Sequence, residues 1–171
     1  MKKIFSISFL FLLLFLLFSR SNKPLQLNTL GTTTTPTIIN QQLVKVAHVI
    51  DGDTIEIETG QKVRLIGIDT PEVVDPRKPI ECFGKEASLR AKELLEGNLV
   101  RLERDISETD RYGRLLRYIY SGDVFINKQL ISEGYAHASS YPPDIKYQDI
   151  LREAQEDARV NNRGLWKGCI N

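Results

Sequence analysis

Two apolar runs that end in acidic motifs constrain the fold of this chain most strongly. The first run, Val44–Ile50, leads into Asp51-Gly52-Asp53-Thr54, and the second, Val63–Ile68, leads into Asp69-Thr70-Pro71-Glu72. Short apolar runs that stop at turn-forming residues are typical of strands. A fold that brings these two strand ends together gathers carboxylates at one place, with Arg64 beside them.

The first part of the chain predicts export. Lys2 and Lys3 precede an apolar run from Ile4 to Phe18, which is the pattern of a secretory signal. The run is shorter than the roughly 18 apolar residues of a membrane-spanning helix, and no small-residue cleavage site stands out near Ser19-Arg20-Ser21. We interpret residues 1–20 as a signal peptide or an uncleaved N-terminal anchor. We therefore expect the protein to be secreted, or anchored on the outer side of the cytoplasmic membrane.

A polar linker and one globular domain are predicted to follow. Residues 21–42 are mostly polar and include a run of threonines, Thr32–Thr35. This composition buries too little apolar surface to offset the chain entropy lost on folding. The predicted domain, residues 43–171, carries 19 of the 23 basic residues and all 22 acidic ones. Its net charge is therefore negative, and any nucleic-acid partner must be recognised by a local site rather than by bulk charge.

The two cysteines of the chain are Cys82 and Cys169. An even number of cysteines in an exported protein favours a disulfide, and two free buried thiols are the alternative. A structural zinc site that also used His48 and His137 is disfavoured, because the sequence contains no closely spaced pair of ligands.

The periodicity of the predicted domain mixes strands and helices. Thr54–Glu58 alternates apolar and polar residues ahead of Thr59-Gly60, which is a hairpin signal. Further strands are predicted at Val63–Ile68, Leu99–Leu102 and Leu115–Tyr120. Apolar residues recur at helical spacing near Ala87–Leu95, Ile126–Ile131 and Tyr147–Ala158. About five short strands interrupted by helices predict a small α+β domain built on a barrel or a curled sheet.

The acidic motifs supply candidate metal ligands. Pro71 disfavours helical dihedral angles at Thr70, so the Thr70 carbonyl is free to face a ligand. Together with the carboxylates of Asp53 and Asp69, it offers the oxygen donors that Ca²⁺ prefers. Two carboxylates predict weak binding, on the order of 10⁻⁴–10⁻³ M. The alternative is that these aspartates only cap turns.

Arginine is uncommon within an apolar strand unless its charge is paired. Arg64 is therefore expected either to pair with Asp69 or Glu72, or to grip a phosphate in bidentate fashion. Arg114 follows a polar turn and is weaker evidence by itself. Tyr112 in that turn is suited to stacking on a base or to hydrogen bonding with a phosphate, although packing would also explain it.

Taken together, the motifs resemble those of the thermonuclease family, the staphylococcal-nuclease-like proteins. The matching segments are Asp-Gly-Asp-Thr around Asp53, the arginine Arg64, Asp69-Thr70-Pro71-Glu72, and Asp110-Arg111-Tyr112-Gly113-Arg114. They occur in the family's order with compatible spacing, over roughly Val44 to Trp166. The resemblance implies a five-stranded OB-fold β-barrel with three helices, and Ca²⁺-dependent cleavage of DNA and RNA that leaves 3′-phosphates.

The resemblance also implies a role for each matched residue. Asp53, Asp69 and the Thr70 carbonyl would hold Ca²⁺. Arg64 and Arg114 would bind the scissile phosphate and its developing charge, and Glu72 would position or deprotonate the attacking water. The substrate-binding residues would be Arg111, Tyr112 and Tyr141. We expect DNA and RNA as substrates and no obligate protein partner.

Two departures from the family pattern concern substrate binding. Arg111 stands where the family has a lysine, which keeps the charge. The family's stacking tyrosine falls near Ser139-Ser140-Tyr141, where only Tyr141 is suited to the role. The competing prediction is a non-catalytic OB-fold module that binds nucleic acid or protein. Such a module would not need the full set of acidic and basic residues that this chain carries.

Overall fold

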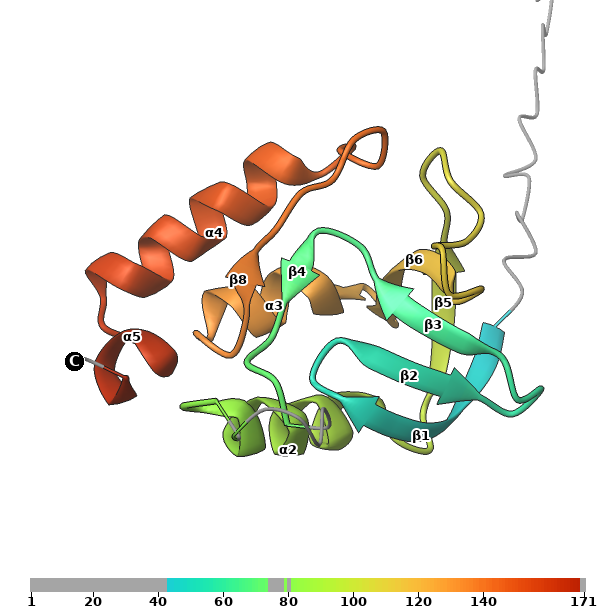
Figure 1. The fold of residues 1–171 in the computed structure, drawn as a ribbon, viewed down its shortest axis with the longest axis horizontal. Coiled ribbons are helices and arrows are strands. Elements are labelled where there is room, and N and C mark those ends of the chain that lie inside the picture. The colour runs from blue at the N-terminus through green and yellow to red at the C-terminus, as the bar shows by residue number, and fades with distance from the viewer. Residues whose placement is uncertain (1–42, 74–78, 80, 170–171) are drawn as a thin grey trace, which may run out of the picture. The chain divides into compact units, whose positions relative to one another are not determined.

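In the computed structural model, which describes residues 43–73, 79 and 81–169, five strands close into a barrel (Figure 1). Neighbouring strands are antiparallel in the order β3-β2-β1-β5-β6, and a parallel pairing of β3 with β6 closes the barrel. The predicted α+β fold on a five-stranded OB-fold barrel is confirmed. The barrel strands are β1 (Leu43–Asp51), β2 (Thr54–Ile57), β3 (Lys62–Leu65), β5 (Leu99–Glu103) and β6 (Leu115–Ser121), and β7 (Val124–Phe125) extends the sheet beyond β6.

The barrel encloses a core built from the apolar positions of these strands. In β2, Ile55 and Ile57 are buried while Glu56 between them is only partly covered, as expected where one face of a strand points inward. The turn after β2 closes with the Gly60 amide donating to the Ile57 carbonyl at 2.8 Å. The core continues from the barrel into the helices, and includes Val46, Val63, Leu65, Val100, Ile119, Leu130 and Leu151.

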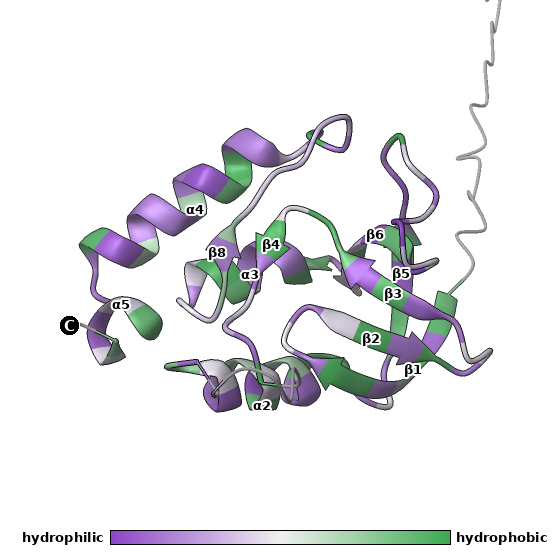
Figure 2. Cartoon of the chain, in the orientation of Figure 1, coloured by the Kyte–Doolittle hydropathy of each residue, from purple (hydrophilic) through white to green (hydrophobic). Residues whose placement is uncertain are grey.

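Helices cover the barrel and form a second layer beside it. α2 (Gly84–Leu95) packs against β1, and α3 (Ile126–Ser132) packs against both β6 and α4 (Gln148–Val160). Hydrophobic bands interrupt the mostly hydrophilic α4 (Figure 2), and its buried residues are Leu151, Ala154 and Ala158. This spacing places one apolar stripe on the helix. A short helix, α5 (Leu165–Gly168), follows.

The predicted continuous strand Val63–Ile68 is wrong, because the chain turns sharply within it. β3 ends at Leu65, and β4 (Ile68–Asp69) pairs instead with β8 (His137–Ala138). Gly67 between them has φ +77°, a conformation that side chains other than glycine rarely adopt. A Cβ there would also lie 2.5 Å from a Leu151 methyl carbon. The turn therefore redirects Asp69 away from the barrel strand.

A fully buried asparagine fixes this turn. The Asn127 side-chain amide donates to the Ile66 carbonyl at 2.8 Å, and its oxygen accepts from the Ile119 amide at 2.9 Å. One side chain thus satisfies two backbone groups that would otherwise be buried without partners. The break before Asp69 is consequently tied to β6 through the start of α3.

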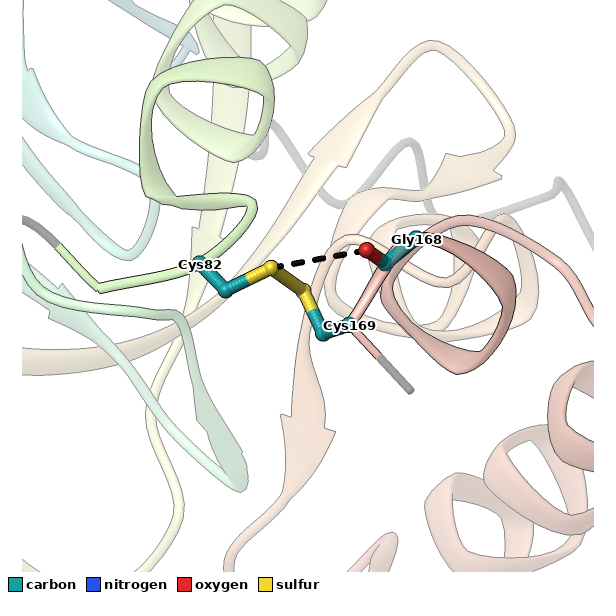
Figure 3. Close-up of a disulfide and its surroundings, with 3 residues drawn as sticks. All are labelled: Cys82, Gly168 and Cys169. Carbon is teal, nitrogen blue, oxygen red and sulfur yellow. Dashed lines mark hydrogen bonds between the residues drawn. A yellow bond between two sulfur atoms is a disulfide. The ribbon is translucent and has the colours of Figure 1, made fainter. Parts of the chain in front are cut away.

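A disulfide joins Cys82, just before α2, to Cys169 at the end of α5 (Figure 3). The two Cα atoms are 5.9 Å apart, and the Cys82 sulfur lies 3.7 Å from the Gly168 carbonyl oxygen. This bond ties two segments that are 87 residues apart in sequence.

The predicted signal or anchor and the predicted linker lie outside the described residues. All described residues fall within one compact unit, Asn40–Asn171. Across the described ranges, every helix is too short or too polar to cross a lipid bilayer.

Candidate active site

Arg64 lies between the two acidic motifs and pairs with both. Its Nη1 is 2.8 Å from the Asp53 carboxylate, and its Nη2 is 2.9 Å from that of Asp69. The Arg64 and Asp53 side chains are only 16% and 8% exposed, whereas Asp69 is 59% exposed. Of the alternatives considered for Arg64, pairing with Asp69 is therefore present, and Asp53 is an additional partner.

Backbone pairing explains why these residues meet. Thr54 in β2 is the register partner of Arg64 in β3, and the Leu65 amide donates to the Asp53 carbonyl at 2.9 Å. The Asp53 carboxylate then accepts from both the amide and the hydroxyl of Thr70, at 2.9 and 3.2 Å. The ends of two strands are thereby joined, as their sequence predicted.

Burial and the negative charge of neighbouring carboxylates raise the pKa of acidic groups in this cluster. Burial, followed by the charge of Asp53, raises the pKa of Asp51 to about 6. Burial also raises the pKa of Asp69, and the charge of Asp53 adds to this, while Arg64 opposes it. Asp53 and Asp69 pair with Arg64, and Asp51 lies close to Asp53, so the cluster holds more acidic groups than its one guanidinium balances, and a cation would offset their charge.

The donors at this cluster suit a hard cation. Carboxylates of Asp53 and Asp69, with the backbone of Thr70 held beside Asp53, are oxygen ligands of the kind that Ca²⁺ takes. No group of three or more His, Cys, Asp or Glu side chains placed to hold a metal occurs in residues 43–73, 79 and 81–169. A site here would therefore depend on two carboxylates, a carbonyl and water, and should bind weakly.

The turn before β6 positions Arg114 through Asp110. One oxygen of the Asp110 carboxylate accepts from the amides of Tyr112 and Arg114, at 2.9 and 3.0 Å, and the other accepts from Arg114 Nε at 2.7 Å. Burial favours the neutral acid, but these hydrogen bonds outweigh it and hold the pKa of Asp110 below its ordinary value. Arg114 is thus held by its neighbour, with part of its guanidinium still available.

Thr54 connects this turn to the acidic cluster. Its hydroxyl donates to the Asp53 carboxylate at 3.1 Å and accepts from Arg114 Nη1 at 3.3 Å. Arg64 on β3 and Arg114 in the turn before β6 therefore both lie beside Thr54 at the start of β2. The structure brings together these two predicted residues.

A pocket of about 530 Å³ opens beside the arginines. Tyr112 and Tyr141 on its wall are 68% and 72% exposed, and Arg111 donates to the Tyr112 hydroxyl at 2.6 Å. Arg64 belongs both to this wall and to the acidic cluster. The pocket is lined by Arg64, Leu65, Ile66, Gly67, Ile68, Asp110, Arg111, Tyr112, Arg114, Leu116, Ser139, Tyr141 and Asp144.

Glu72 lies outside that lining. It follows β4 on the segment that leads toward α2, and its carboxylate accepts from the Val73 amide at 2.9 Å. Its own amide donates to the Glu81 carboxylate at 3.1 Å. The structure therefore gathers Arg64, Arg114, Arg111, Tyr112 and Tyr141 around one pocket, and joins it to the acidic pair through Arg64.

Sequence reasoning did not assign roles to Asp110, Thr54 and Glu81. An aspartate at the start of a turn that ends in glycine is a recognisable signal for side-chain capping of backbone amides. The role of Asp110 could therefore have been predicted from the sequence. The role of Thr54 depends on how strands pair across the barrel. The contact of Glu81 with Glu72 spans a loop and has no local sequence signal.

Comparison with known proteins agrees with this arrangement. Residues 62–168 match the family described as staphylococcal nuclease homologue. The chain is 45% identical over 130 residues to a thermonuclease of Staphylococcus hyicus (74% of this chain and 77% of the relative), and 44% identical over 125 residues to one of Staphylococcus intermedius (71% and 74%). It is 39% identical over 140 residues to the endonuclease YncB of Bacillus subtilis (77% and 66%). By both the family match and these identities, the chain belongs to the staphylococcal nuclease family.

Proposed function

We propose that this protein is an exported, Ca²⁺-dependent nuclease that hydrolyses phosphodiester bonds of DNA and RNA and leaves 3′-phosphates. The observation that carries the proposal is the position of Arg64, which pairs with the two candidate metal ligands Asp53 and Asp69 and also lines the pocket with Arg114. A phosphate at this point would meet two guanidinium groups beside an acidic cluster. The relatives named as thermonucleases and an endonuclease support the same activity.

The arginines are suited to stabilise charge on the phosphate. Arg64 lies on β3 and Arg114 lies in the turn directly before β6, and carboxylates fix the positions of both before any substrate binds. Donors that are already oriented cost little reorganisation when negative charge develops in the transition state. Bidentate contacts from guanidinium groups also fix the orientation of the phosphate. We therefore assign phosphate binding and charge stabilisation to these two residues.

Glu72 is assigned to the attacking water, either as the general base or as the group that orients it. It is the acidic residue that ends the Asp69-Thr70-Pro71-Glu72 motif, and its carboxylate is anchored on the Val73 amide. A carboxylate in hydrogen-bond reach of water can accept its proton. When bound by Asp53, Asp69 and the Thr70 carbonyl, Ca²⁺ would neutralise phosphate charge and help to order water.

The pocket wall fits a nucleotide next to the phosphate. Tyr112 and Tyr141 expose most of their surface, and base stacking on aromatic rings tolerates any base. The guanidinium carbon of Arg111 lies 4.7 Å from the centre of the Tyr112 ring, which adds positive charge at the same edge. Stacking on a base and charge contact with a phosphate are open to DNA and RNA alike.

Export is part of the proposal and depends on the first 20 residues. Lys2 and Lys3 before the apolar run Ile4–Phe18 are the pattern of a secretory signal. The Cys82–Cys169 disulfide is also typical of oxidising compartments. The protein would act outside the cell, in free form or attached to the outer side of the membrane through an uncleaved N-terminal anchor.

The test is digestion of DNA and of RNA by the purified protein with Ca²⁺, and then with a chelator in excess. We expect cleavage only with Ca²⁺. A 3′-phosphatase should then release inorganic phosphate from the 3′ ends of the products. Activity that persists in the chelator would overturn the metal dependence. Binding of labelled oligonucleotide without cleavage would instead identify a non-catalytic OB-fold module.

A further inference from the structure

On the basis of the proposed function, we propose that Glu81 is a positioning residue for Glu72, and that the Cys82–Cys169 disulfide holds Glu81 in place. Hydrolysis would then be faster in the oxidised form of the enzyme than in the reduced form. Neither cysteine belongs to the metal-binding or phosphate-binding motifs. Their effect on catalysis would be transmitted through the segment that precedes α2.

Glu81 and Glu72 contact each other twice. The Glu72 amide donates to the Glu81 carboxylate at 3.1 Å, and the Glu81 amide donates to the Glu72 carbonyl at 3.0 Å. These reciprocal bonds fix the backbone of Glu72 on both sides of its Cα atom. A side chain whose backbone is fixed has fewer orientations from which to reach a water molecule, so Glu81 preorganises Glu72.

The start of α2 packs tightly on the same segment. The Gly84 amide donates to the Glu81 carbonyl at 3.0 Å. A Cβ on Gly84 would lie 2.6 Å from a Val73 methyl carbon and 3.1 Å from the Pro71 carbonyl oxygen. The first residue of α2 therefore touches the chain on either side of Glu72, and a shift of this helix end would move the candidate base.

The disulfide acts on that helix end. Cys82 lies directly between Glu81 and Phe83, and Phe83 has φ +68°, a conformation that is unfavourable for a bulky residue. The Phe83 ring packs on Tyr135 with ring centroids 5.4 Å apart, and a Cβ on Gly168 would touch it at 3.3 Å. The bond to Cys169 thus holds a strained backbone against α5 (Figure 3). Without the bond, Phe83 can relax and release Glu81.

The chemistry of the switch is thiol–disulfide exchange. When the bond forms, the two thiols of Cys82 and Cys169 lose two protons and two electrons, and a disulfide-bearing oxidant is reduced to two thiols. A dithiol reductant reverses the step. Its thiolate attacks one sulfur, which forms a mixed disulfide and releases the other cysteine; its second thiolate then attacks the reductant's own sulfur in the mixed disulfide, which releases the second cysteine and leaves the reductant as a disulfide. The enzyme would therefore be weakly active in a reducing compartment and fully active after export.

The first test separates the side chain of Glu81 from the disulfide. In Glu81→Ala, which keeps both cysteines, we expect kcat to fall about 10-fold with KM nearly unchanged, the scale for a modest misplacement of a catalytic group. Glu81→Gln keeps an oxygen that can accept from the Glu72 amide, so it should recover most of kcat. Equal losses in both variants, or no loss in Glu81→Ala, would overturn the positioning role.

The second test examines oxidation. Oxidised protein, protein treated with dithiothreitol, and the variant Cys82→Ser/Cys169→Ser are compared for kcat at a temperature where Trp166 fluorescence shows each to be folded. We expect a loss of about 10-fold on reduction and in the variant, and no effect of dithiothreitol on the variant. Full activity of the folded, reduced protein would overturn the oxidation dependence.

A readout without substrate separates this proposal from the proposed function. Hydrogen exchange of the Glu72 amide should accelerate in Glu81→Ala and on reduction, whether or not the protein cleaves nucleic acid. Unchanged protection of that amide would refute the positioning of Glu72 by Glu81, even in an active enzyme. Conversely, oxidised wild-type protein that cleaves neither DNA nor RNA with Ca²⁺ would refute the proposed function. Faster hydrogen exchange of the Glu72 amide in Glu81→Ala and on reduction would still support the contact of Glu81 with Glu72.

Discussion

The guanidinium of Arg64 lies 2.8 Å from the carboxylate of Asp53, and both side chains are almost removed from solvent. Removing one partner of such a pair leaves the other charge buried without full compensation. Arg64 also keeps a second, more exposed partner in Asp69. The guanidinium of Arg64 therefore links the two acidic motifs.

Asp53→Asn tests both roles of this residue. We expect the free energy of unfolding to fall by about 1–3 kcal/mol, because Arg64 loses one of its two carboxylates. We also expect Ca²⁺ to raise the Tm of the wild-type protein but not that of the variant, since a ligand that binds the folded state stabilises it. The control is Asp123→Asn, at an exposed turn outside the site. An unchanged response to Ca²⁺ in Asp53→Asn would exclude this residue as a ligand.

Glu72→Gln retains the shape of the side chain and removes its basicity. Turnover should fall by roughly 10²–10⁴-fold, the range for loss of a general base, while Ca²⁺ still raises Tm as in the wild-type protein. Single-turnover cleavage of an oligonucleotide measures the first effect, and thermal unfolding measures the second. If Ca²⁺ binding were lost together with activity, Glu72 would have to be reassigned as a metal ligand.

Arg114→Ala should lower turnover by about 10²–10³-fold, the scale for losing one donor to developing charge. Stability should change little, because the residue lies in a turn and is partly exposed. Arg104→Ala is the matched control, since Arg104 is an exposed arginine paired with Glu108 outside the pocket. A similar, small loss in both variants would indicate that Arg114 acts only through general surface charge.

Sequence patterns predicted the barrel well because its strands and helices have clear periodicity. They failed at Ile66-Gly67, where an apolar run continues although the backbone turns. The apolar composition of this segment indicates that its side chains are buried, but it does not indicate the direction of the backbone. The turn depends on Gly67 and on the buried side chain of Asn127, which comes from α3, 61 residues away from Ile66. No local pattern near residue 67 contains that contact.

The candidate site also contains residues that the sequence predicted and residues that it did not. Asp53, Arg64 and Asp69 were predicted because each interrupts or ends an apolar run, which requires a specific reason. Glu81 was not, because its partner Glu72 lies across a loop and glutamates are common on surfaces. Contacts made by tertiary packing between polar residues leave no period in the sequence.

Asp144 should make the free energy of unfolding depend on pH in the acid range. It is buried, and its carboxylate accepts from the amides of Ile106 and Ser107, at 3.0 and 2.8 Å. Burial alone would raise the pKa, but the hydrogen bonds from Ser107 and Ile106 hold the pKa of Asp144 below its ordinary value of 3.8. Because the folded-state pKa is the lower one, the stabilisation is complete above pH 3.8 and is lost as pH falls through the folded-state value.

Asp144→Asn checks this dependence by urea unfolding from pH 7 down to pH 2. We expect the variant to be less stable at neutral pH, and the difference from the wild-type protein to shrink in the acid range. A stability difference that stays constant across the whole range would show that the carboxylate charge contributes nothing.

The disulfide gives the last prediction. In protein isolated from an oxidising compartment, mass spectrometry without reduction should find no alkylatable thiol, since the described structure contains Cys82 and Cys169 only as a bonded pair. The bond closes a loop across 87 residues, for which chain entropy predicts about 4–5 kcal/mol of stabilisation. The variant Cys82→Ser/Cys169→Ser should lose much of this in urea unfolding. A loss below about 1 kcal/mol would mean that the unfolded chain is already compact enough to gain little from the crosslink.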